Sequence, residues 1–267
     1  MKLKNTLALS LAAVMAAGLT ACGSGADTAS PAADSTAAES TEAAADTTAA
    51  PDGDGDPTTL TVAMECAYAP YNWTQNDDAN GAVEIRGSSD YAYGYDVMMA
   101  KKIGEALGQK VQIVKLDWDS LIPAVMSGDV DCVIAGQSIT AERAAQVDFS
   151  APYYYASIIT LTKKDSPFAA AKSVADLKGA TCTSQQSTIW YDTCLPQIED
   201  ANVLSATANA PDMLMSLNAG KCDIVVTDQP TGKGALIAYP DFVMLDFGGA
   251  EGDFQVTNEE INIGISM

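Results

Sequence analysis

Apolar residues follow alternating strand and helix patterns from residue 60 onward. Residues 60–64 form an apolar run of strand length, and residues 111–116 form another. Between these runs, apolar side chains recur at the helical spacing of Val97, Ala100, Ile103 and Leu107. Alternating strand and helix patterns predict an α/β fold with largely parallel sheets.

An internal similarity predicts two lobes. The pattern Gly-x-x-Asp followed by an apolar strand occurs at residues 128–135 and again at 220–227, each time after an apolar helix-like segment. Residues 153–162 are long, apolar and β-rich, as expected for a strand that crosses between lobes. We therefore expect one lobe over 58–156 and a second, with a returning hinge strand, over 157–267. Because ligands of α/β sheets bind outside the carboxyl ends of the strands, two facing lobes predict a cleft.

The first 21 residues have the pattern of a targeting signal. Lys2 and Lys4 precede an apolar run over residues 7–19, which is too short to span a membrane comfortably. Residues 19–22 are similar to a lipobox, in which Cys22 is lipidated and becomes the new N-terminus. The alternative is an ordinary secretory signal, which leaves the cysteine at the cleavage site unexplained. We expect an exported protein, lipid-anchored at Cys22 to the outer face of the cytoplasmic membrane.

Residues 22–57 predict a disordered acidic tether. They consist mainly of Ala, Thr, Ser, Asp, Glu, Gly and Pro, which cannot bury enough apolar surface to offset the entropy cost of ordering. The whole chain has a formal net charge of −21. This charge argues against nucleic acid as a partner, because nucleic-acid binding needs basic patches.

The stretch 134–143 predicts a binding site for a carboxylate. Gly136 ends an apolar strand, and Ser138 and Thr140 offer helix-capping hydroxyls. A helix start exposes unpaired N–H groups that attract anions, and Arg143 adds a planar fork that fits a carboxylate. The alternative is a capped helix whose Arg143 pairs with a nearby Asp or Glu.

Several motifs in a fixed order carry a family resemblance. They lie at residues 94–97 (Gly-Tyr-Asp-Val), 118–124, 127–136, 138–143 and 147–154. With them, residues 58–267 resemble the bacterial extracellular solute-binding proteins of family 3, which serve amino-acid ABC importers. One departure is Met98, at a helix position where the family usually has an acidic residue.

The resemblance implies a fold and a function. The fold would be the two-lobed, type II periplasmic-binding-protein-like α/β fold, each lobe a mostly parallel sheet flanked by helices, with the ligand cleft between them. The chain would capture a polar L-amino acid as a monomer, close on its zwitterion and deliver it to an ABC permease, without a cofactor. Two alternatives are a dehydratase-like exported enzyme on this fold and a ligand-sensing subunit of a membrane receptor.

The resemblance also implies the ligand-binding positions. Arg143 would clamp the ligand carboxylate, Asp228 its ammonium group, and Glu65 its side chain. The remaining positions are the aromatic walls and the hydroxyl or backbone contacts, namely Tyr68, Trp118, Ala135, Gly136, Ser138, Ser187 and Thr188. Tyr68 and Trp118 have a plain alternative as core aromatics. Gln186 stands where the family usually has a glycine, which weakens the expectation for the two residues after it.

Catalysis and metal binding find little support in the composition. The chain has no histidine, which removes the usual base of Ser-His or Cys-His pairs and the commonest zinc ligand. No Walker-type phosphate loop appears. Carboxylates and lysines remain available as acids and bases, but no motif points to turnover, so we expect neither an enzyme nor a metal site.

Three features leave alternatives open. Cys182 and Cys194 lie in one lobe, and a disulfide between them depends on a separation that sequence does not give. Residues 76–92 are longer than the family's hairpin and would either cover the cleft mouth or form a surface insertion. Residues 261–267 match the family's strand that recrosses to lobe 1 ahead of further helices, so we expect the sequence to be truncated.

Overall fold

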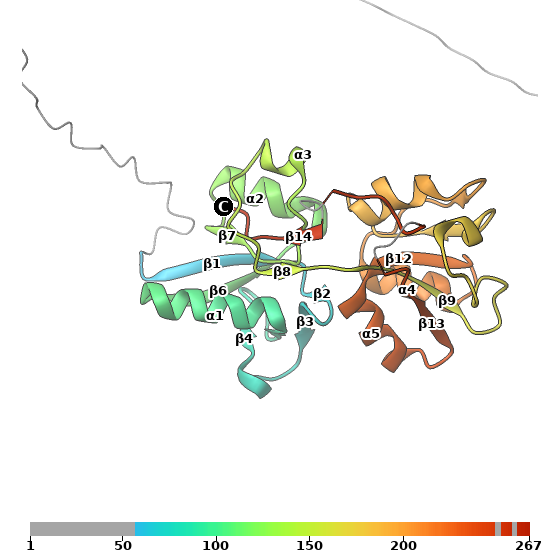
Figure 1. Cartoon of the computed structure of the whole chain (residues 1–267). Coiled ribbons are helices and arrows are strands. Elements are labelled where there is room, and N and C mark those ends of the chain that lie inside the picture. Colours follow the sequence, from blue (N-terminus) through green and yellow to red (C-terminus); the bar gives the residue numbers. More distant parts are fainter. Residues whose placement is uncertain (1–56, 249–251, 258–260) are drawn as a thin grey trace, which may run out of the picture. The chain divides into compact units, whose positions relative to one another are not determined.

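The computed structural model describes residues 57–248, 252–257 and 261–267 (Figure 1). The predicted signal at 1–21, the lipidation site Cys22 and the tether up to residue 56 lie outside the described residues. Within the described ranges, no helix combines the length and the apolar character needed to cross a membrane.

The first lobe is built on a parallel sheet with β1 (Thr59–Met64) in its centre. β6 (Lys110–Lys115) pairs along its whole length on one side, and β7 (Cys132–Val133) pairs on the other. The flanking helices are α1 (Tyr95–Leu107) and α2 (Leu121–Ser127), which follows the 3₁₀ turn η2 (Trp118–Ser120). β7 is shorter than the strand expected over 130–135, because Gly136 turns the chain away from the sheet with a φ of +65°.

A second sheet of the first lobe takes two short strands from the segment 76–92. The antiparallel order is β2 (Ala67–Tyr68), β3 (Asn72–Gln75), β5 (Tyr91–Tyr93) and β4 (Val83–Glu84), with the 3₁₀ turn η1 (Ala79–Gly81) between β3 and β4. Ile85 bridges Ile113 of β6 and so ties this sheet to the first. Among the described residues, none of 76–92 lines the cavities at the candidate site, which favours a surface insertion over a cover.

The second lobe has the largely parallel sheet that the sequence predicts, with β9 running against the other strands. Its order is β11 (Asn202–Val203), β10 (Thr181–Thr183), β12 (Ile224–Asp228), β9 (Ile158–Lys163) and β13 (Phe242–Leu245). β10, β11 and β12 are parallel, whereas β9 runs antiparallel to both of its neighbours. The helical elements are η3 (Val174–Leu177), η4 (Trp190–Cys194), η5 (Leu195–Gln197), α4 (Ala210–Asn218) and α5 (Gln229–Ala238).

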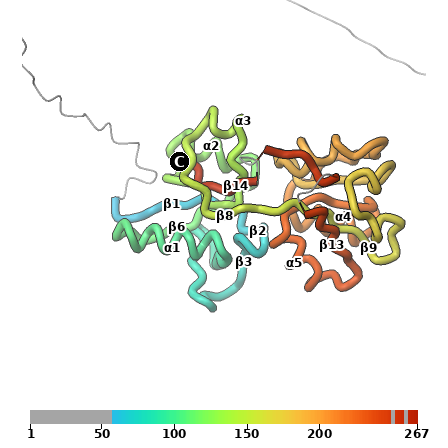
Figure 2. The backbone as a smooth tube through the Cα atoms, viewed as in Figure 1, coloured from blue at the N-terminus to red at the C-terminus, as the bar shows by residue number. Residues whose placement is uncertain are grey.

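The chain passes between the lobes twice (Figure 2). The expected crossing strand over 153–162 is split into β8 (Tyr154–Tyr155), which belongs to the first lobe, and β9 of the second. β14 (Asn262–Ile263) returns and pairs antiparallel with β8, and Ser266 then bridges Val133 and Phe149. The last described residues therefore pair with segments of the first lobe.

Each lobe has its own hydrophobic cluster. In the first lobe, fully buried side chains include Met64, Ile113, Leu121 and Ile134. In the second, they include Ile159, Leu177, Leu195, Met213 and Leu217. Tyr68 and Tyr71 belong by sequence to the first lobe but pack into the second cluster, so these two aromatic side chains already join the lobes.

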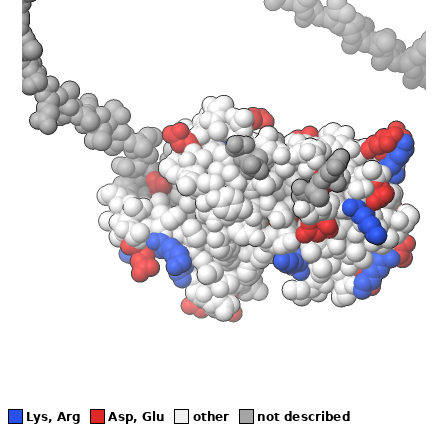
Figure 3. All heavy atoms as spheres, in the orientation of Figure 1, with Lys and Arg blue, Asp and Glu red and all other residues white. Residues whose placement is uncertain are grey.

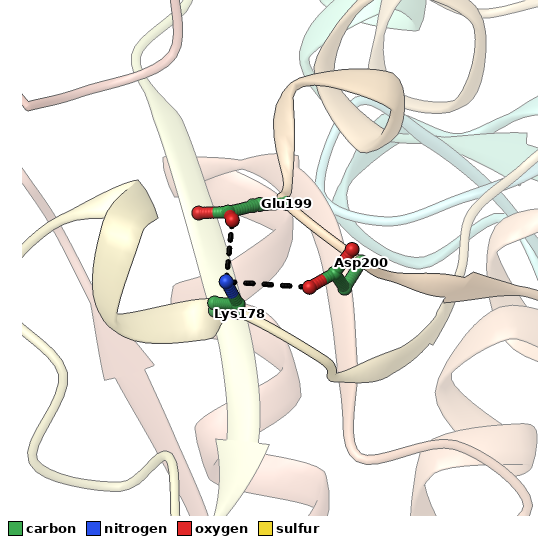
Figure 4. A network of polar contacts seen from close by, with 3 residues as sticks. All are labelled: Lys178, Glu199 and Asp200. Carbon is green, nitrogen blue, oxygen red and sulfur yellow. Dashed lines mark hydrogen bonds and ion pairs between the residues drawn. The ribbon is translucent and has the colours of Figure 1, made fainter.

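Surface ion pairs and the Cys182–Cys194 pair contribute little to the stability of the described fold. In the view of Figure 3, acidic and basic side chains are scattered rather than gathered into one patch. Lys178 pairs with Glu199 and Asp200 (Figure 4), and such an exposed pair contributes at most about 1 kcal/mol. Cys182 is a buried free thiol, so the disulfide with Cys194 that the sequence left open is not formed.

Candidate functional site

The stretch 134–143 folds as the sequence predicts, with one change in the capping residue. α3 (Ala141–Ala144) is a single turn whose N-cap is Thr140, and the Thr140 hydroxyl accepts a hydrogen bond from the Arg143 amide at 3.2 Å. Ser138 does not cap the helix; its carbonyl accepts from the Arg143 guanidinium at 2.8 Å. A Cβ on Gly136 would lie 2.9 Å from the Tyr68 ring, so only glycine allows this close approach.

Arg143 reaches across to the second lobe. Its second guanidinium nitrogen donates to the Ser187 carbonyl at 2.7 Å, and its charge lies 5.3 Å from the centre of the Trp118 ring. Burial lowers the pKa of Arg143 to about 10. Among the described residues no carboxylate forms an ion pair with Arg143, so the alternative of a simple Arg–Asp or Arg–Glu pair is wrong. Its donors face neutral carbonyl groups, which an anionic carboxylate would outcompete.

Asp228 is a fully buried carboxylate at the carboxyl end of β12. It caps α5 by accepting from the Thr231 amide at 2.9 Å, and it also accepts from the Thr231 hydroxyl at 3.0 Å. From the first lobe, the Tyr68 hydroxyl donates to it. Burial raises the pKa of Asp228. Its bonded donors are all neutral, so the ionised carboxylate has no balancing positive charge and favours a bound cation.

Glu65 of the first lobe contacts the second lobe at the site through Gln185. It is a buried residue just after β1, and the Gln185 side-chain amide of the second lobe donates to its two oxygens at 3.2 and 3.3 Å. The pKa of Glu65 is raised to about 7, mainly by burial and to a smaller extent by the charges of Asp117 and Asp119. The Gln185 hydrogen bond and the charge of Lys115 act in the opposite direction. A cationic or amide group of a ligand would stabilise the ionised form.

Two neighbouring cavities lie at this junction. The inner one measures about 10 Å³ and is lined by Tyr68, Trp118, Gly136, Ser138, Arg143, Gln185, Thr188 and Trp190. The outer one measures about 570 Å³, shares Trp118, Arg143 and Thr188 with the inner one, and adds three acidic side chains, Asp119, Glu142 and Asp192. The inner space holds about one water molecule, so an amino acid reaches it only when the surrounding side chains move apart.

The structure brings most of the predicted residues together. Six of them line the inner cavity, namely Tyr68, Trp118, Gly136, Ser138, Arg143 and Thr188. Ser187 lines the outer cavity and supplies its carbonyl to Arg143. Glu65 and Asp228 line neither cavity but bond directly to the lining residues Gln185 and Tyr68. Ala135 is buried in the core of the first lobe and lines neither cavity.

Sequence reasoning missed two residues that line the inner cavity, the acidic residues of the outer cavity, and the hydrogen bonds behind the site. Gln185 and Trp190 flank the predicted Ser187-Thr188 pair, and their closeness in sequence to that pair was the available signal. Behind the cavity, Tyr153 accepts a hydrogen bond from the Gly136 amide at 3.1 Å and donates to Asp96 at 2.7 Å. Nothing local in the sequence indicated that bond between residues 57 positions apart.

The chain is similar in sequence to known amino-acid-binding proteins. Residues 60–220 match the model of a family described as bacterial extracellular solute-binding proteins, family 3. A probable histidine-binding protein of Campylobacter jejuni is 30% identical over 199 residues, which cover 73% of this chain and 71% of that protein. The arginine-binding extracellular protein ArtP of Bacillus subtilis is 33% identical over 130 residues, 49% of this chain and 45% of ArtP.

Solved structures show the same fold. The substrate-binding protein of an amino acid ABC transporter aligns with a TM-score of 0.65 and 29% identity, covering 78% of this chain and 84% of that one. The arginine-bound, truncated ArgBP of T. maritima aligns with a TM-score of 0.63 and 28% identity over 79% of this chain and 88% of that one. Both share the two-lobed α/β architecture.

Proposed function

The chain belongs to the bacterial extracellular solute-binding proteins, family 3, and from this premise we propose that it captures a polar L-amino acid and delivers it to an ABC permease. The proposal rests on the positions of two side chains on opposite lobes of the site. Arg143 lies on the first lobe, and Asp228, a buried carboxylate without an ionic partner among the described residues, lies on the second. Each charge would be satisfied by one end of a zwitterion. The relatives compared above are named as binding proteins, and we propose binding without chemical turnover.

The bonds already present suggest what a ligand replaces. A ligand carboxylate would take the place of the Ser187 carbonyl on Arg143, because a charged acceptor binds the guanidinium more strongly than a neutral one. A ligand ammonium would add to the Tyr68 hydroxyl at Asp228. Since the two charges of the ligand are satisfied by different lobes, binding would favour the state in which the lobes are closed.

The ligand side chain would meet Glu65 and the acidic outer cavity. Glu65 lies beside Gln185 of the inner cavity, and Asp119, Glu142 and Asp192 line the outer one. This negative surrounding favours a cationic or amide side chain. Arginine and histidine are therefore the first candidates, and they are also the amino acids for which the two relatives are named.

The location of the protein is the second part of the proposal. We propose that Cys22 carries a lipid that anchors the exported protein to the outer face of the cytoplasmic membrane. Support comes from the lipobox-like residues 19–22. Cys22→Ala is expected to release the protein into the medium or to leave it unprocessed, as detected by fractionation and the mass of the mature chain. A membrane-bound, correctly cleaved variant would contradict the anchor.

The binding proposal is tested by calorimetry with a panel of amino acids on three variants. Arg143→Met and Asp228→Asn should each weaken binding by about 2–5 kcal/mol, because each leaves one charge of the ligand buried and unpaired. Lys178→Met removes a basic side chain of an exposed pair and serves as the control that retains affinity. Binding of the same amino acid by Arg143→Met as tightly as by the unaltered protein would rule out this site.

A further inference from the structure

Asp96 is a buried carboxylate that ligand binding leaves unexplained. It lies in the first turn of α1, is fully buried, and has no ionic partner among the residues that the structure describes. One of its oxygens accepts from the Tyr153 hydroxyl and the other from the Asn72 side-chain amide, both at 2.7 Å. Burial raises the pKa of Asp96 to about 6. An apolar side chain would fill this space without that desolvation cost.

The Asn72 bond leads from Asp96 to the turn that carries Glu65 and Tyr68. The side-chain carbonyl oxygen of Asn72 accepts from the Cys66 amide at 2.7 Å. Cys66 has a φ of +53°, a left-handed conformation that costs energy in a residue other than glycine and persists only where its surroundings hold it. This strained residue directly follows Glu65 and stands two positions before Tyr68. Asn72 therefore fixes the direction in which both side chains leave the turn.

The Tyr153 bond leads from Asp96 to the stretch that carries Arg143. While the Tyr153 hydroxyl donates its proton to Asp96, it accepts from the Gly136 amide at 3.1 Å. Gly136 is the left-handed residue at which the chain leaves the sheet and packs against the Tyr68 ring. Ser138 and Arg143 follow it. The orientation of this stretch thus depends on a hydroxyl whose proton points to Asp96.

We propose that Asp96 is a positioning residue that sets both first-lobe walls of the ligand site, through Asn72 on one side and Tyr153 on the other. The reason is the direction of the hydrogen bonds. An ionised carboxylate only accepts, so it turns the NH₂ of Asn72 toward itself and the oxygen of Asn72 toward Cys66. It also takes the proton of Tyr153, which leaves a lone pair for Gly136. The inference rests on the proposed amino-acid site, to which it adds a residue that touches no ligand.

The direction of these bonds allows a swap experiment. In Asp96→Asn, the new NH₂ group faces the NH₂ group of Asn72. If the Asn72 side chain flips, its NH₂ group faces the Cys66 amide instead. In either arrangement one hydrogen-bond donor lacks an acceptor. In Asp96→Asn combined with Asn72→Asp, the carboxylate at position 72 accepts from both the Cys66 amide and the new side-chain amide at position 96. The amide oxygen at position 96 still accepts from Tyr153, and every bond of the original arrangement is restored.

We expect Asp96→Asn to weaken arginine binding about 10- to 100-fold in calorimetry, the range that corresponds to one lost buried hydrogen bond to a charged group. The double variant should regain most of that affinity. Asp131→Asn is the matched control, because Asp131 binds the Thr61 amide at 2.7 Å in the same lobe but lies outside the site; it should lower the melting temperature and leave affinity unchanged.

Amide hydrogen exchange supplies a readout that needs no ligand. Exchange of the Cys66 and Gly136 amides should accelerate about tenfold or more in Asp96→Asn and slow again in the double variant. If the unaltered protein binds no amino acid, the proposed function fails while exchange still tests Asp96. Should Asp96→Asn not fold, Tyr153→Phe decides, since it removes the hydroxyl that links Asp96 to Gly136 and leaves the Asn72 bond in place. Unchanged affinity and exchange in Tyr153→Phe, or a double variant no better than Asp96→Asn, overturns the proposal.

Discussion

Three buried carboxylates set the electrostatics of the candidate site at the scale of single residues. Burial is the largest cause of the raised pKa in Glu65, Asp96 and Asp228. Among the described residues none of the three forms an ion pair. Each carboxylate therefore opposes folding when it is ionised, and a bound cation would recover part of that cost.

Glu65 should make stability depend on pH in the direction opposite to a surface acid. Its pKa rises from 4.5 to about 7 in the folded protein, so between these values the unfolded chain loses a proton that the native state retains. Stability must then fall as pH increases through this window and level off above the folded pKa. The contribution is on the order of 1–3 kcal/mol, measured by urea unfolding without ligand at pH 5 and pH 8.

Glu65→Gln isolates this contribution from those of Asp96 and Asp228. The variant should lose less stability than the unaltered protein between pH 5 and pH 8. Glu199→Gln, at an exposed ion pair, should leave the slope unchanged. A Glu65→Gln slope identical to the original would show that Glu65 is ionised in the folded state well below pH 7.

At the scale of elements, the single turn α3 carries the proposed carboxylate clamp. Such a short helix has little stability of its own, so its cap and its flanking contacts determine its position. The Thr140 hydroxyl accepts from the amide of Arg143 itself. Capping and ligand binding therefore involve the same residue, one through its backbone and the other through its side chain.

Thr140→Ala should cost about 1 kcal/mol of stability through the lost cap and should also weaken ligand binding several-fold, because α3 no longer holds the Arg143 backbone. Thermal unfolding and calorimetry measure the two effects. Thr140→Ser retains the hydroxyl and should behave as the unaltered protein. An affinity loss of equal size in both variants would point to the lost methyl group rather than to the cap.

At the scale of the whole described fold, direct contacts between the lobes surround the site. Arg143 reaches Ser187, Gln185 reaches Glu65, and the Gln186 side chain donates to Asp119. The last contact comes from the residue that replaces the glycine of the family motif. It lies at the exposed rim, where it can stabilise closure without touching the ligand.

Gln186→Ala should accelerate ligand dissociation about 2- to 10-fold, which corresponds to the usual net value of one hydrogen bond. Gln186→Glu should accelerate it further, because the new carboxylate would face Asp119. Stopped-flow release of a bound amino acid measures both. Gln112→Ala, at a polar contact with Arg86 in the first lobe, is the control. Equal dissociation rates in all three variants would exclude this contact from closure.

The local patterns of the sequence determined the elements and their order. The strand expected over 60–64 is β1, the spacing from Val97 to Leu107 is α1, and the doubled Gly-x-x-Asp pattern precedes β7 and β12. Periodicity and capping depend on neighbours within a few residues, so they are visible in the chain itself. The family motifs, from which the binding residues were predicted, are also short local stretches of sequence.

The hydrogen-bond partners of the buried polar side chains depend on the tertiary structure. Tyr68 meets Asp228 at a separation of 160 residues, and Glu65 meets Gln185 at 120. Asp96 joins Asn72 to Tyr153, and β9 is placed antiparallel between β12 and β13 inside an otherwise parallel sheet. A buried polar group must find a partner somewhere, but its identity depends on how distant segments pack. The local periodicity of apolar residues does not specify which distant residues come into contact.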